Sequence, residues 1–353
     1  MSTPVGPGTG AVGATDRPAD RAGPRRLDVA VERFPIAGRF TIARGSRTEA
    51  VVVVARVTGR DACGLGECVP YARYGESVEA VAAALQGQAD AVAHGLDRGT
   101  LQQAMPAGAA RNALDAALWC EEARRAGRPV WALAGLPAPQ PVTTAYTLSL
   151  DSPQAMATAA AGAASRPLLK IKLGGAEGGA EDPARIAAVR AAAPGSTLIA
   201  DANEGWTEST LERNLAACAA AGVALVEQPL PASADALLEG LRSPVPLAAD
   251  ESFHGLDGID AVARRYAVVN LKLDKTGGLT AAIDVARAAR ARGLGLMVGC
   301  MVGTSLGMAP AFLLAPWARF VDLDGPLLLA RDREPGFAYE GSTMLPAAPG
   351  VWD

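Results

Sequence analysis

The chain has 353 residues, of which 50% are hydrophobic and 20% charged, and its formal net charge is −4. This length is enough for one large domain and a smaller one, each with a sizeable core, and the lack of a basic signature argues against nucleic-acid binding. No run of about 18 uninterrupted apolar residues occurs, so no membrane span is expected.

The beginning of the chain and its cysteines predict a cytoplasmic protein. Residues 1–26 are rich in Gly, Pro, Ala, Asp and Arg and contain no apolar segment, so they predict a disordered tail rather than a signal peptide. The five cysteines have scattered spacings and no nearby histidine completes a zinc set. They are expected to be free thiols, which fits a reducing compartment.

The next part of the chain predicts a small α+β domain. Strands are expected at 27–34 and 50–58, the second being strongly β-branched. Residues 41–47 between them are interpreted as a polar loop that carries two arginines. Helical segments are expected near 77–93 and 106–126, where apolar residues recur at helical spacing.

From about residue 141 strands and helices alternate, which predicts an α/β fold, a TIM-type (β/α)7β barrel with the α+β domain as an N-terminal cap. The strands are expected near 143–149, 167–173, 197–202, 223–227, 246–251, 267–273, 294–299 and 319–324, with helices such as 181–193 and 279–292 between them. An open doubly wound sheet is the alternative, but no glycine-rich dinucleotide motif and no P-loop is present. The expected division is a tail at 1–26, the capping domain at 27–140, the barrel at 141–328 and a C-terminal segment returning to the capping domain at 329–353.

Three consecutive barrel strands end on an acidic residue, namely Asp201, Glu227 and Asp250. Parallel strands joined by helices all point the same way, so these carboxylates are expected to gather at one mouth of the barrel. Three converging oxygen ligands suit a hard divalent cation such as Mg²⁺. Any one of them could be an ordinary charge of the barrel rim, but three in register favour a metal site.

Lysines flank these acids along the chain. Lys170 and Lys172 lie on the strand before them and point to the same face, since strand side chains alternate. Lys272 lies on the strand after them, which in a closed barrel is on the other side of the mouth. Buried lysines are costly unless they are paired or functional, so one ammonium group on each side of a metal suggests paired acid/base chemistry.

Five motifs in this order resemble the muconate-lactonizing subgroup of the enolase superfamily, whose sites combine a Lys or His base with Mg²⁺. The motifs are Lys170-Ile-Lys172, Asp201-Ala-Asn203, Glu227-Gln-Pro229, Ala249-Asp-Glu-Ser252 and Asn270-Leu-Lys-Leu-Asp-Lys-Thr-Gly-Gly278. The resemblance implies that the three acids bind Mg²⁺ and that Lys172 and Lys272 exchange a proton on opposite faces of the substrate. Lys170 would be the neighbouring positive charge that favours the neutral form of Lys172. Supporting roles are expected for Asn203, Glu251, Asp274 and Lys275.

Asp322-Leu-Asp324, at the end of the eighth strand, is similar to the Asp-x-Asp of dipeptide epimerases. In that family the pair binds the ammonium group of a dipeptide. The resemblance therefore implies a Mg²⁺-dependent epimerase that inverts the α-carbon of the C-terminal residue, with L-Ala-D-Glu or L-Ala-L-Glu from murein peptides as the expected substrate. The further candidates for substrate contact are Arg44, Arg47, Arg73, Thr147 and Met301.

Other functions stay open at this point. A cycloisomerase, an N-acylamino acid racemase or an o-succinylbenzoate synthase needs the same metal and lysines but no ammonium-binding pair, so Asp322 and Asp324 favour the epimerase. A non-catalytic metal- or ligand-binding barrel is disfavoured by the intact acids and lysines. His94 and His254 do not lie at the seventh strand end, which argues against a His-Lys racemase. The expected partner is a small dipeptide, with no nucleic acid or membrane, and a homo-oligomer is left open.

Overall fold

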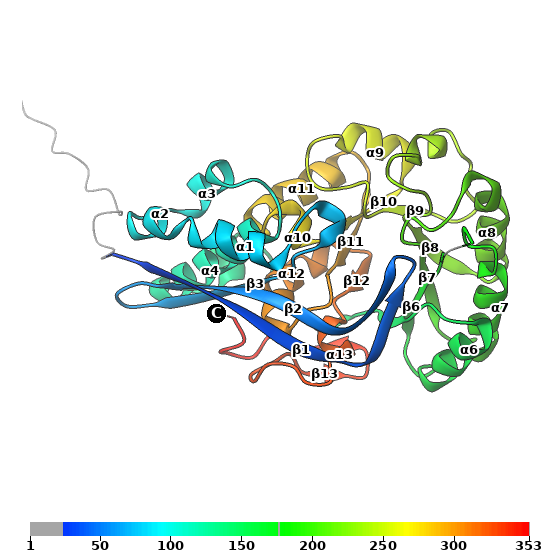
Figure 1. Ribbon diagram of the computed structural model, residues 1–353, viewed down its shortest axis with the longest axis horizontal. Helices are drawn as coiled ribbons and strands as arrows, with labels where there is room; N and C mark the ends of the chain where they lie inside the picture. Colours follow the sequence, from blue (N-terminus) through cyan, green and yellow to red (C-terminus); the bar gives the residue numbers. More distant parts are fainter. Residues whose placement is uncertain (1–23, 176, 353) are drawn as a thin grey trace, which may run out of the picture.

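The computed structural model describes residues 24–175 and 177–352, so the tail predicted at 1–26 lies outside the described residues apart from 24–26. A three-stranded antiparallel sheet forms the N-terminal part, in the order β1 (Arg26–Ile42), β2 (Gly45–Thr58) and β3 (Cys63–Cys68). Its first two strands form a long hairpin that runs across the molecule and ends beside the barrel strands (Figure 1).

The hairpin corrects one expectation from the sequence. Residues 41–47 are not a loop, because the two strands stay paired as far as Ile42 opposite Gly45. Only Ala43 and Arg44 form the turn. Gly45 follows with a φ of 139°, which glycine adopts without steric cost, so a two-residue connection can close the hairpin.

Five helices accompany this sheet: α1 (Val78–Gln86), α2 (Ala89–Ala93), α3 (Arg98–Ala104), α4 (Ala109–Ala126) and α5 (Val130–Leu133). Helix α4 approaches β3 so closely that a Cβ atom at Gly64 or Gly66 would lie 2.0 or 2.1 Å from a backbone oxygen of the helix. Glycine is therefore required at both positions. The two helical regions expected from the sequence are confirmed, although the first is divided at Gly87 and Gln88.

The C-terminal part is the predicted TIM-type barrel. Its eight parallel strands are neighbours in chain order. The ring is nearly closed, since the backbone N–H of Ala145 donates to the carbonyl of Val321 at 2.8 Å. The strands are β5 (Tyr146–Leu148), β6 (Leu168–Lys172), β7 (Thr197–Asp201), β8 (Val223–Glu227), β9 (Leu247–Ala249), β10 (Val268–Leu271), β11 (Gly295–Gly299) and β12 (Phe320–Asp322).

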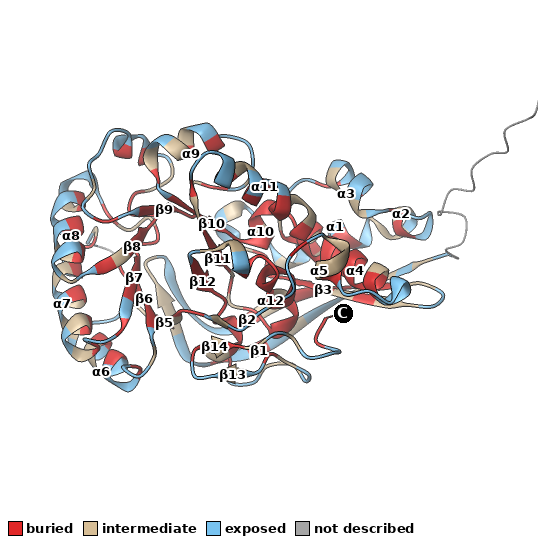
Figure 2. Ribbon diagram, turned by 180° about the vertical axis from the view of Figure 1, so that it is seen from behind, coloured by how far each residue is buried: buried red, intermediate tan, exposed pale blue. Residues whose placement is uncertain are grey.

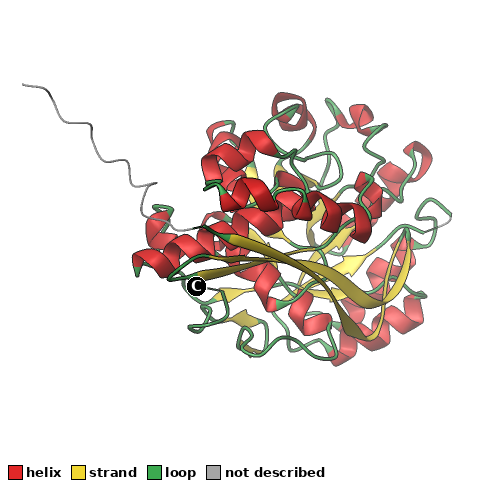
Figure 3. Cartoon of the chain, turned by 60° about the vertical axis from the view of Figure 1, so that its left-hand side comes forward, coloured by secondary structure: helices red, strands yellow, loops and turns green. Residues whose placement is uncertain are grey.

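Helices surround these strands (Figure 3). They are α6 (Pro153–Gly162), α7 (Asp182–Ala192), α8 (Glu208–Ala220), α9 (Ile259–Arg265), α10 (Leu273–Thr276), α11 (Leu279–Ala291), α12 (Ser305–Phe312) and α13 (Gly325–Leu328). The crossover between β8 and β9 departs from the expected alternation, because it contains only the 3-10 helix η3 (Asp235–Leu238). Prolines at both ends of this crossover shorten the stretch that can be helical.

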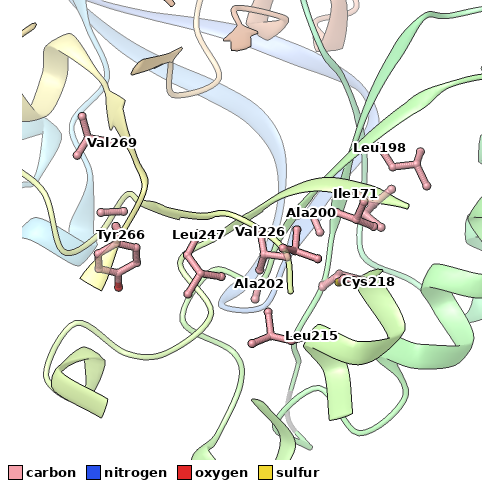
Figure 4. Packing of buried hydrophobic residues seen from close by; sticks show 14 of the residues in the cluster. Ile171, Leu198, Ala200, Ala202, Leu215, Cys218, Val226, Leu247, Tyr266 and Val269 are labelled. Carbon is pink, nitrogen blue, oxygen red and sulfur yellow. The ribbon is translucent and has the colours of Figure 1, made fainter. Parts of the chain in front are cut away.

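The barrel wall is buried on both faces, as the colouring of the strands in Figure 2 shows. On the outer face, Ile171 and Val226 belong to the cluster that packs against the helices, where Cys218 of α8 lies (Figure 4). On the inner face, Leu168 and Ile199 belong to a separate apolar layer. Burial on both faces is typical of parallel strands, and it fixes the direction of the side chains at the strand ends.

The residues after β12 run back to the N-terminal sheet. The backbone N–H of Ala330 donates to the carbonyl of Pro35 at 2.8 Å, and the indole of Trp352 donates to the carbonyl of Leu65 at 2.9 Å. A small sheet joins β13 (Tyr339–Glu340) and β14 (Thr343–Met344) to β4 (Val142–Thr143). The exact domain boundaries stay predictions, and none of the five cysteines forms a disulfide. Among the described residues, no helix combines the length and the apolar character needed to cross a bilayer.

Candidate active site

Three carboxylates lie together at the carboxyl ends of consecutive barrel strands. Asp201 ends β7, Glu227 ends β8, and Asp250 directly follows β9. All three side chains are buried, and one oxygen of each lies within 4.8 Å of the others. Residues that are regularly spaced along the chain lie close together here because the parallel strands end at the same mouth of the barrel.

Two of the predicted lysines contact different members of this acid cluster. Nζ of Lys172, at the end of β6, lies 2.6 Å from Oδ2 of Asp201. Nζ of Lys272, directly after β10, lies 2.6 Å from Oδ2 of Asp250. Strands β6 and β10 stand on either side of the three acid-bearing strands, so the two ammonium groups reach the cluster from opposite sides.

Lys170 lies one layer deeper in the barrel than Lys172. Its Nζ lies 2.6 Å from Oε2 of Glu227, 2.8 Å from Oδ2 of Asp322 and 3.1 Å from Oδ2 of Asp201. Burial lowers the pKa of Lys170, but these three carboxylates outweigh burial and hold the pKa well above its ordinary value. Lys170 is therefore a fixed positive charge among acids.

The protonation of the other groups depends on the same contacts. Burial raises the pKa of Glu227 to about 7, more than Lys170 can offset. For Asp250, burial acts in the same direction, but Lys272 and Lys275 reverse it and hold the pKa well below its usual range. Nζ of Lys275 lies 2.6 Å from Oδ1 of Asp250. The cluster thus titrates as one electrostatic unit rather than as independent groups.

The backbone beside these carboxylates is strained. Asn203, Glu204 and Gln228 are non-glycine residues in the left-handed region, with φ values of 47°, 66° and 36°. Such conformations cost about 1–3 kcal/mol each and concentrate at functional sites. Here they serve the acids, because the N–H of Asn203 donates to Oδ1 of Asp201 and the side chain of Gln228 accepts from the N–H of Asp250.

A cavity of about 430 Å³ lies between the acid cluster and the N-terminal hairpin. Both lysines that flank the acids open into it, together with apolar side chains of the hairpin. Its size is within the range of small-molecule sites. The predicted site residues that line the cavity are Lys172, Lys272, Asp250, Asn203, Arg44, Arg47, Arg73 and Met301.

The acid pair of the eighth strand lies outside this lining. Asp322 ends β12 beside Lys170, and Oδ2 of Asp324 accepts from the backbone N–H of Thr147 at 2.7 Å. Burial, followed by the charge of Asp322, raises the pKa of Asp324 to about 7. Both carboxylates are buried, and Oδ1 of Asp322 accepts no hydrogen bond from the described residues. The pair therefore retains acceptor capacity.

Arg44, in the hairpin turn, is engaged by the protein itself. Its Nη2 donates to Oε1 of Glu251 at 2.6 Å and to the hydroxyl of Tyr71 at 2.9 Å. Its Nη1 donates to the carbonyl of Asn203 at 2.8 Å and to Oε2 of Glu204 at 3.2 Å. Two carboxylates thus neutralise this guanidinium.

The other two arginines at the cavity differ in their partners. Arg73 forms a bidentate pair with Glu204, at 2.7 Å for each of its two hydrogen bonds. Arg47 has no acid partner within residues 24–175 and 177–352, and its guanidinium lies 5.4 Å from the ring centroid of Tyr71. In this part of the chain, Arg47 is thus the cavity arginine whose charge is not neutralised.

Sequence reasoning missed Glu204, which binds two arginines of the cavity lining. These arginines, Arg73 and Arg44, are 131 and 160 residues away from it along the chain. The only signal for Glu204 is its position just after a strand that ends on Asp201, and that signal does not reveal its partners.

The acid cluster fits a divalent cation. Its donor set consists of three carboxylates without cysteine or histidine, which are the hard oxygen ligands that Mg²⁺ prefers. Oε2 of Glu227 is buried and accepts no well-directed hydrogen bond from the described residues, although Lys170 lies beside it. A buried carboxylate oxygen without a full partner is costly, and a cation would satisfy it.

The chain matches two family models. One is described as mandelate racemase / muconate lactonizing enzyme, N-terminal domain, and matches residues 25–135; the other, enolase C-terminal domain-like, matches residues 152–351. The L-Ala-D/L-Glu epimerase of Escherichia coli (strain K12) is 45% identical over 320 residues, which cover 89% of this chain and 98% of that protein. The N-acetyl-D-glutamate racemase of Pseudoalteromonas sp is 43% identical over 305 residues, which cover 85% of this chain and 95% of that protein.

Solved structures agree with these matches. An enolase family member from Agrobacterium tumefaciens with homology to dipeptide epimerases, solved with bound sodium and L-Ala-L-Glu, is 52% identical with a TM-score of 0.90, over 94% of this chain and 100% of that chain. A dipeptide epimerase from Methylococcus capsulatus, complexed with Mg and L-Arg-D-Lys, is 30% identical with a TM-score of 0.84, over 94% of this chain and 99% of that chain.

Proposed function

The chain belongs to the mandelate racemase/muconate lactonizing enzyme family, and from this premise we propose that it is a Mg²⁺-dependent dipeptide epimerase. It inverts the α-carbon of the C-terminal residue by removing the α-proton on one face and returning a proton on the other. The observation that carries the proposal is the pair Lys172 and Lys272, which reach one acid cluster from opposite sides and open into one cavity. Two bases so placed invert a stereocentre without redox chemistry.

Asp201, Glu227 and Asp250 are the residues that hold Mg²⁺ in this proposal. The bound ion supplies positive charge that stabilises the negative charge developing on the substrate carboxylate as the α-proton leaves. Lys275 contacts Oδ1 of Asp250 and Lys272 contacts Oδ2, so Lys275 holds this carboxylate in place through an ion pair that does not involve the proposed base.

The proton transfers use the two flanking lysines in alternation. When Lys172 accepts the α-proton, Lys272 donates one to the opposite face, and the roles exchange for the reverse reaction. Lys170 and Lys172 share Oδ2 of Asp201, so Lys170 helps to hold this carboxylate in place beside Lys172. The hairpin and Tyr71 border the cavity and restrict the access of water to the reacting carbon.

The substrate of the proposal is L-Ala-L-Glu or L-Ala-D-Glu. Asp322 and Asp324 bind its ammonium group, and the backbone N–H of Thr147 orients Asp324. Arg47 binds the side-chain carboxylate of the Glu residue, because it is the cavity arginine without an acid partner in the described chain. Arg44, which two acids neutralise, supports the site instead. The names of the Escherichia coli and Agrobacterium tumefaciens relatives support this substrate class.

An N-acylamino acid racemase is the second candidate, since the Pseudoalteromonas relative is named N-acetyl-D-glutamate racemase. This reaction uses the same lysines and acids. An acylated amino group carries no charge, however, and would leave Asp322 and Asp324 without a cation to bind. These two buried carboxylates share one nearby lysine, Lys170. The remaining negative charge favours a substrate with a free ammonium group.

Steady-state kinetics with L-Ala-L-Glu and with its N-acetylated form separate the two candidates. Loss of one partner of a buried charge pair costs on the order of 2–5 kcal/mol, so kcat/KM should be at least about 30-fold lower for the acetylated compound. The Asp324→Asn variant should lose most of this preference. Equal kcat/KM values for the two compounds would rule out ammonium recognition, and turnover of N-acetylglutamate alone would establish the racemase.

A further inference from the structure

Two capping segments border the cavity, namely the hairpin tip at residues 41–47 and the segment at residues 71–76. Each segment donates hydrogen bonds to the same side chain of the barrel domain. This side chain is Glu204, which lies in the loop after β7. We propose that Glu204 is a positioning residue that holds the two capping segments closed over the cavity. The kinetic consequence of this proposal rests on the proposed epimerase function, whereas its structural consequence does not.

The carboxylate of Glu204 is saturated by donors from three different segments. Its Oε1 accepts from Nη2 of Arg73 at 2.7 Å and from the backbone N–H of Ala232 at 2.9 Å. Its Oε2 accepts from Nε of Arg73 at 2.7 Å and from Nη1 of Arg44 at 3.2 Å. One carboxylate thus joins the hairpin tip, the second capping segment and the loop after β8.

The pair is stronger than an ordinary surface ion pair because Glu204 is shielded from solvent. Only 8% of its side chain is exposed, against 39% for Arg73. Burial raises the pKa of Glu204, but the hydrogen bonds from Arg73 and the N–H of Ala232, with the charge of Arg44, lower it overall. The two parallel hydrogen bonds of Arg73 also require both carboxylate oxygens as acceptors. A glutamine at position 204 has only one acceptor oxygen and cannot replace the carboxylate.

Backbone packing at the same place supports the closed arrangement independently. A Cβ atom added at Gly174 or Gly205 would lie 3.1 or 3.2 Å from Cβ of Ala43 in the hairpin turn. The turn therefore sits on two glycines that leave room for it. Gly205 directly follows Glu204, which itself holds a φ of 66°. The loop after β7 is thus shaped to receive the hairpin tip.

Loss of the ion pairs of Glu204 should affect the two segments unequally. Arg73 loses its carboxylate partner, whereas Arg44 keeps its hydrogen bond to Glu251 at 2.6 Å. The segments also touch each other, since Arg44 donates to the hydroxyl of Tyr71 and Arg47 lies over the ring of Tyr71. We therefore expect the fold to be retained and an open form to be more populated. In this form the side chain of Arg47 no longer lies at the cavity.

Limited proteolysis with trypsin tests the structural consequence without any substrate. Trypsin cleaves after Arg44, Arg47 and Arg73 when these segments leave the barrel, and the cleavage rate follows the population of the open form. The Glu204→Gln variant should shift the equilibrium between the closed and the open form about tenfold, which corresponds to about 1.4 kcal/mol, and cleavage after Arg73, Arg44 and Arg47 should be faster by up to that factor. Mass spectrometry of the first fragments identifies the cleaved bonds.

Matched variants decide the outcome. Glu212→Gln, the same chemical change on the exposed face of α8, should leave the cleavage rate unchanged. Arg73→Gln removes the same ion pair without altering the left-handed residue, and it keeps the test valid if the first variant fails to fold. An unchanged rate at Arg44 and Arg47 in Arg73→Gln, or in a folded Glu204→Gln protein, would overturn the proposal.

Kinetics with L-Ala-L-Glu then separate positioning from catalysis. Because only the closed fraction binds substrate, KM should rise by the factor by which that fraction falls. The fold-changes in cleavage rate and in KM should therefore multiply to about ten, while kcat changes by less than about twofold. A fall in kcat with an unchanged KM would overturn the positioning role. If the wild-type protein does not turn over any dipeptide, the proposed function fails, yet the proteolysis result for Glu204 stands by itself.

Discussion

The floor and the rim of the cavity hold their charges in different ways. On the floor, Lys172 and Lys272 each lie 2.6 Å from a buried carboxylate, and their side chains are 8% exposed. On the rim, Arg44 and Arg73 are 25% and 39% exposed and belong to segments that lie over the barrel without being part of it. The groups proposed to react are therefore fixed by strands, whereas the groups proposed to select and enclose a substrate lie on segments outside the barrel.

This difference has energetic consequences. Breaking a buried charge pair costs about 3–5 kcal/mol, because the remaining charge is left without a partner, whereas an exposed pair contributes about 0–1 kcal/mol. Changes on the floor should thus abolish the reaction, and changes on the rim should alter affinity and selectivity. The predictions below test this contrast, beginning with the largest effect.

Removing one flanking lysine should have the largest effect. Lys272→Ala should reduce epimerisation by about 10³-fold, within the range for loss of a general acid or base. Exchange of the α-proton of one stereoisomer in D₂O should persist, since Lys172 still serves its own face. Proton NMR follows exchange, and chiral analysis of the dipeptide follows inversion.

The Lys272→Arg variant distinguishes a base from a counter-ion. An arginine keeps a positive charge beside Asp250 but does not lose its proton near neutral pH. It should therefore fold like the wild type, as judged by thermal unfolding, and be as inactive as Lys272→Ala. Full inversion in both directions by either variant would exclude the two-base scheme.

Removal of Mg²⁺ is expected to have the next largest effect. The acid cluster consists of three carboxylates, and a divalent ion there supplies several kcal/mol of charge stabilisation. Chelation should lower activity by at least about 10²-fold, and added Mg²⁺ should restore it. An ion that binds the folded protein also raises Tm, so differential scanning calorimetry gives a second readout. Full activity after exhaustive chelation would contradict the metal site.

Arg47 tests the rim with a smaller and more selective effect. Arg47→Gln should lower kcat/KM for L-Ala-L-Glu by about 10- to 100-fold, because a substrate carboxylate loses its charged partner. Turnover of L-Ala-L-Ala should change little. Arg39→Gln, at an exposed position on the same hairpin, is the matched control. Equal losses for the acidic and the apolar dipeptide would show that Arg47 does not select the side chain.

The same contrast explains how far the sequence could predict the site. Asp201, Glu227 and Asp250 come together because strands of regular spacing end at one mouth, and alternation along β6 aligns Lys170 with Lys172. These relations follow from the regular spacing of the strands and from the alternation of side chains along a strand, so they can be predicted without knowing the tertiary contacts. The barrel and its closed order of strands were predictable for the same reason.

The rim could not be predicted in this way. Glu204 and Arg73 are 131 residues apart and lie in parts of the fold whose mutual placement depends on how the hairpin crosses the barrel. For the hairpin, the sequence pattern predicts two shorter strands with a polar loop, because the polar residues at 41–47 show no hydrophobic alternation that would reveal strand pairing. Local pattern determines strand ends, whereas contacts between capping segments and barrel depend on packing.

A buried acid that no lysine contacts gives the smallest predicted effect, and its pKa shift is opposite in sign to that of Asp250. Asp115 of α4 is fully buried and accepts from the N–H of Thr280 at 3.0 Å and from the side chain of Gln102 at 3.2 Å. Burial raises its pKa to about 6, more than these hydrogen bonds offset, whereas lysines hold the pKa of Asp250 below its usual range.

Because the unfolded chain releases the proton of Asp115 near pH 4, the stability that Asp115 contributes is full at low pH and is lost as the pH rises through about 6. The free energy of unfolding of the wild type, relative to the Asp115→Asn variant, should therefore fall by about 1 kcal/mol between pH 5 and pH 8. Urea denaturation of both proteins at the two pH values measures this difference, and parallel pH dependence would show that burial alone does not govern the charge of Asp115.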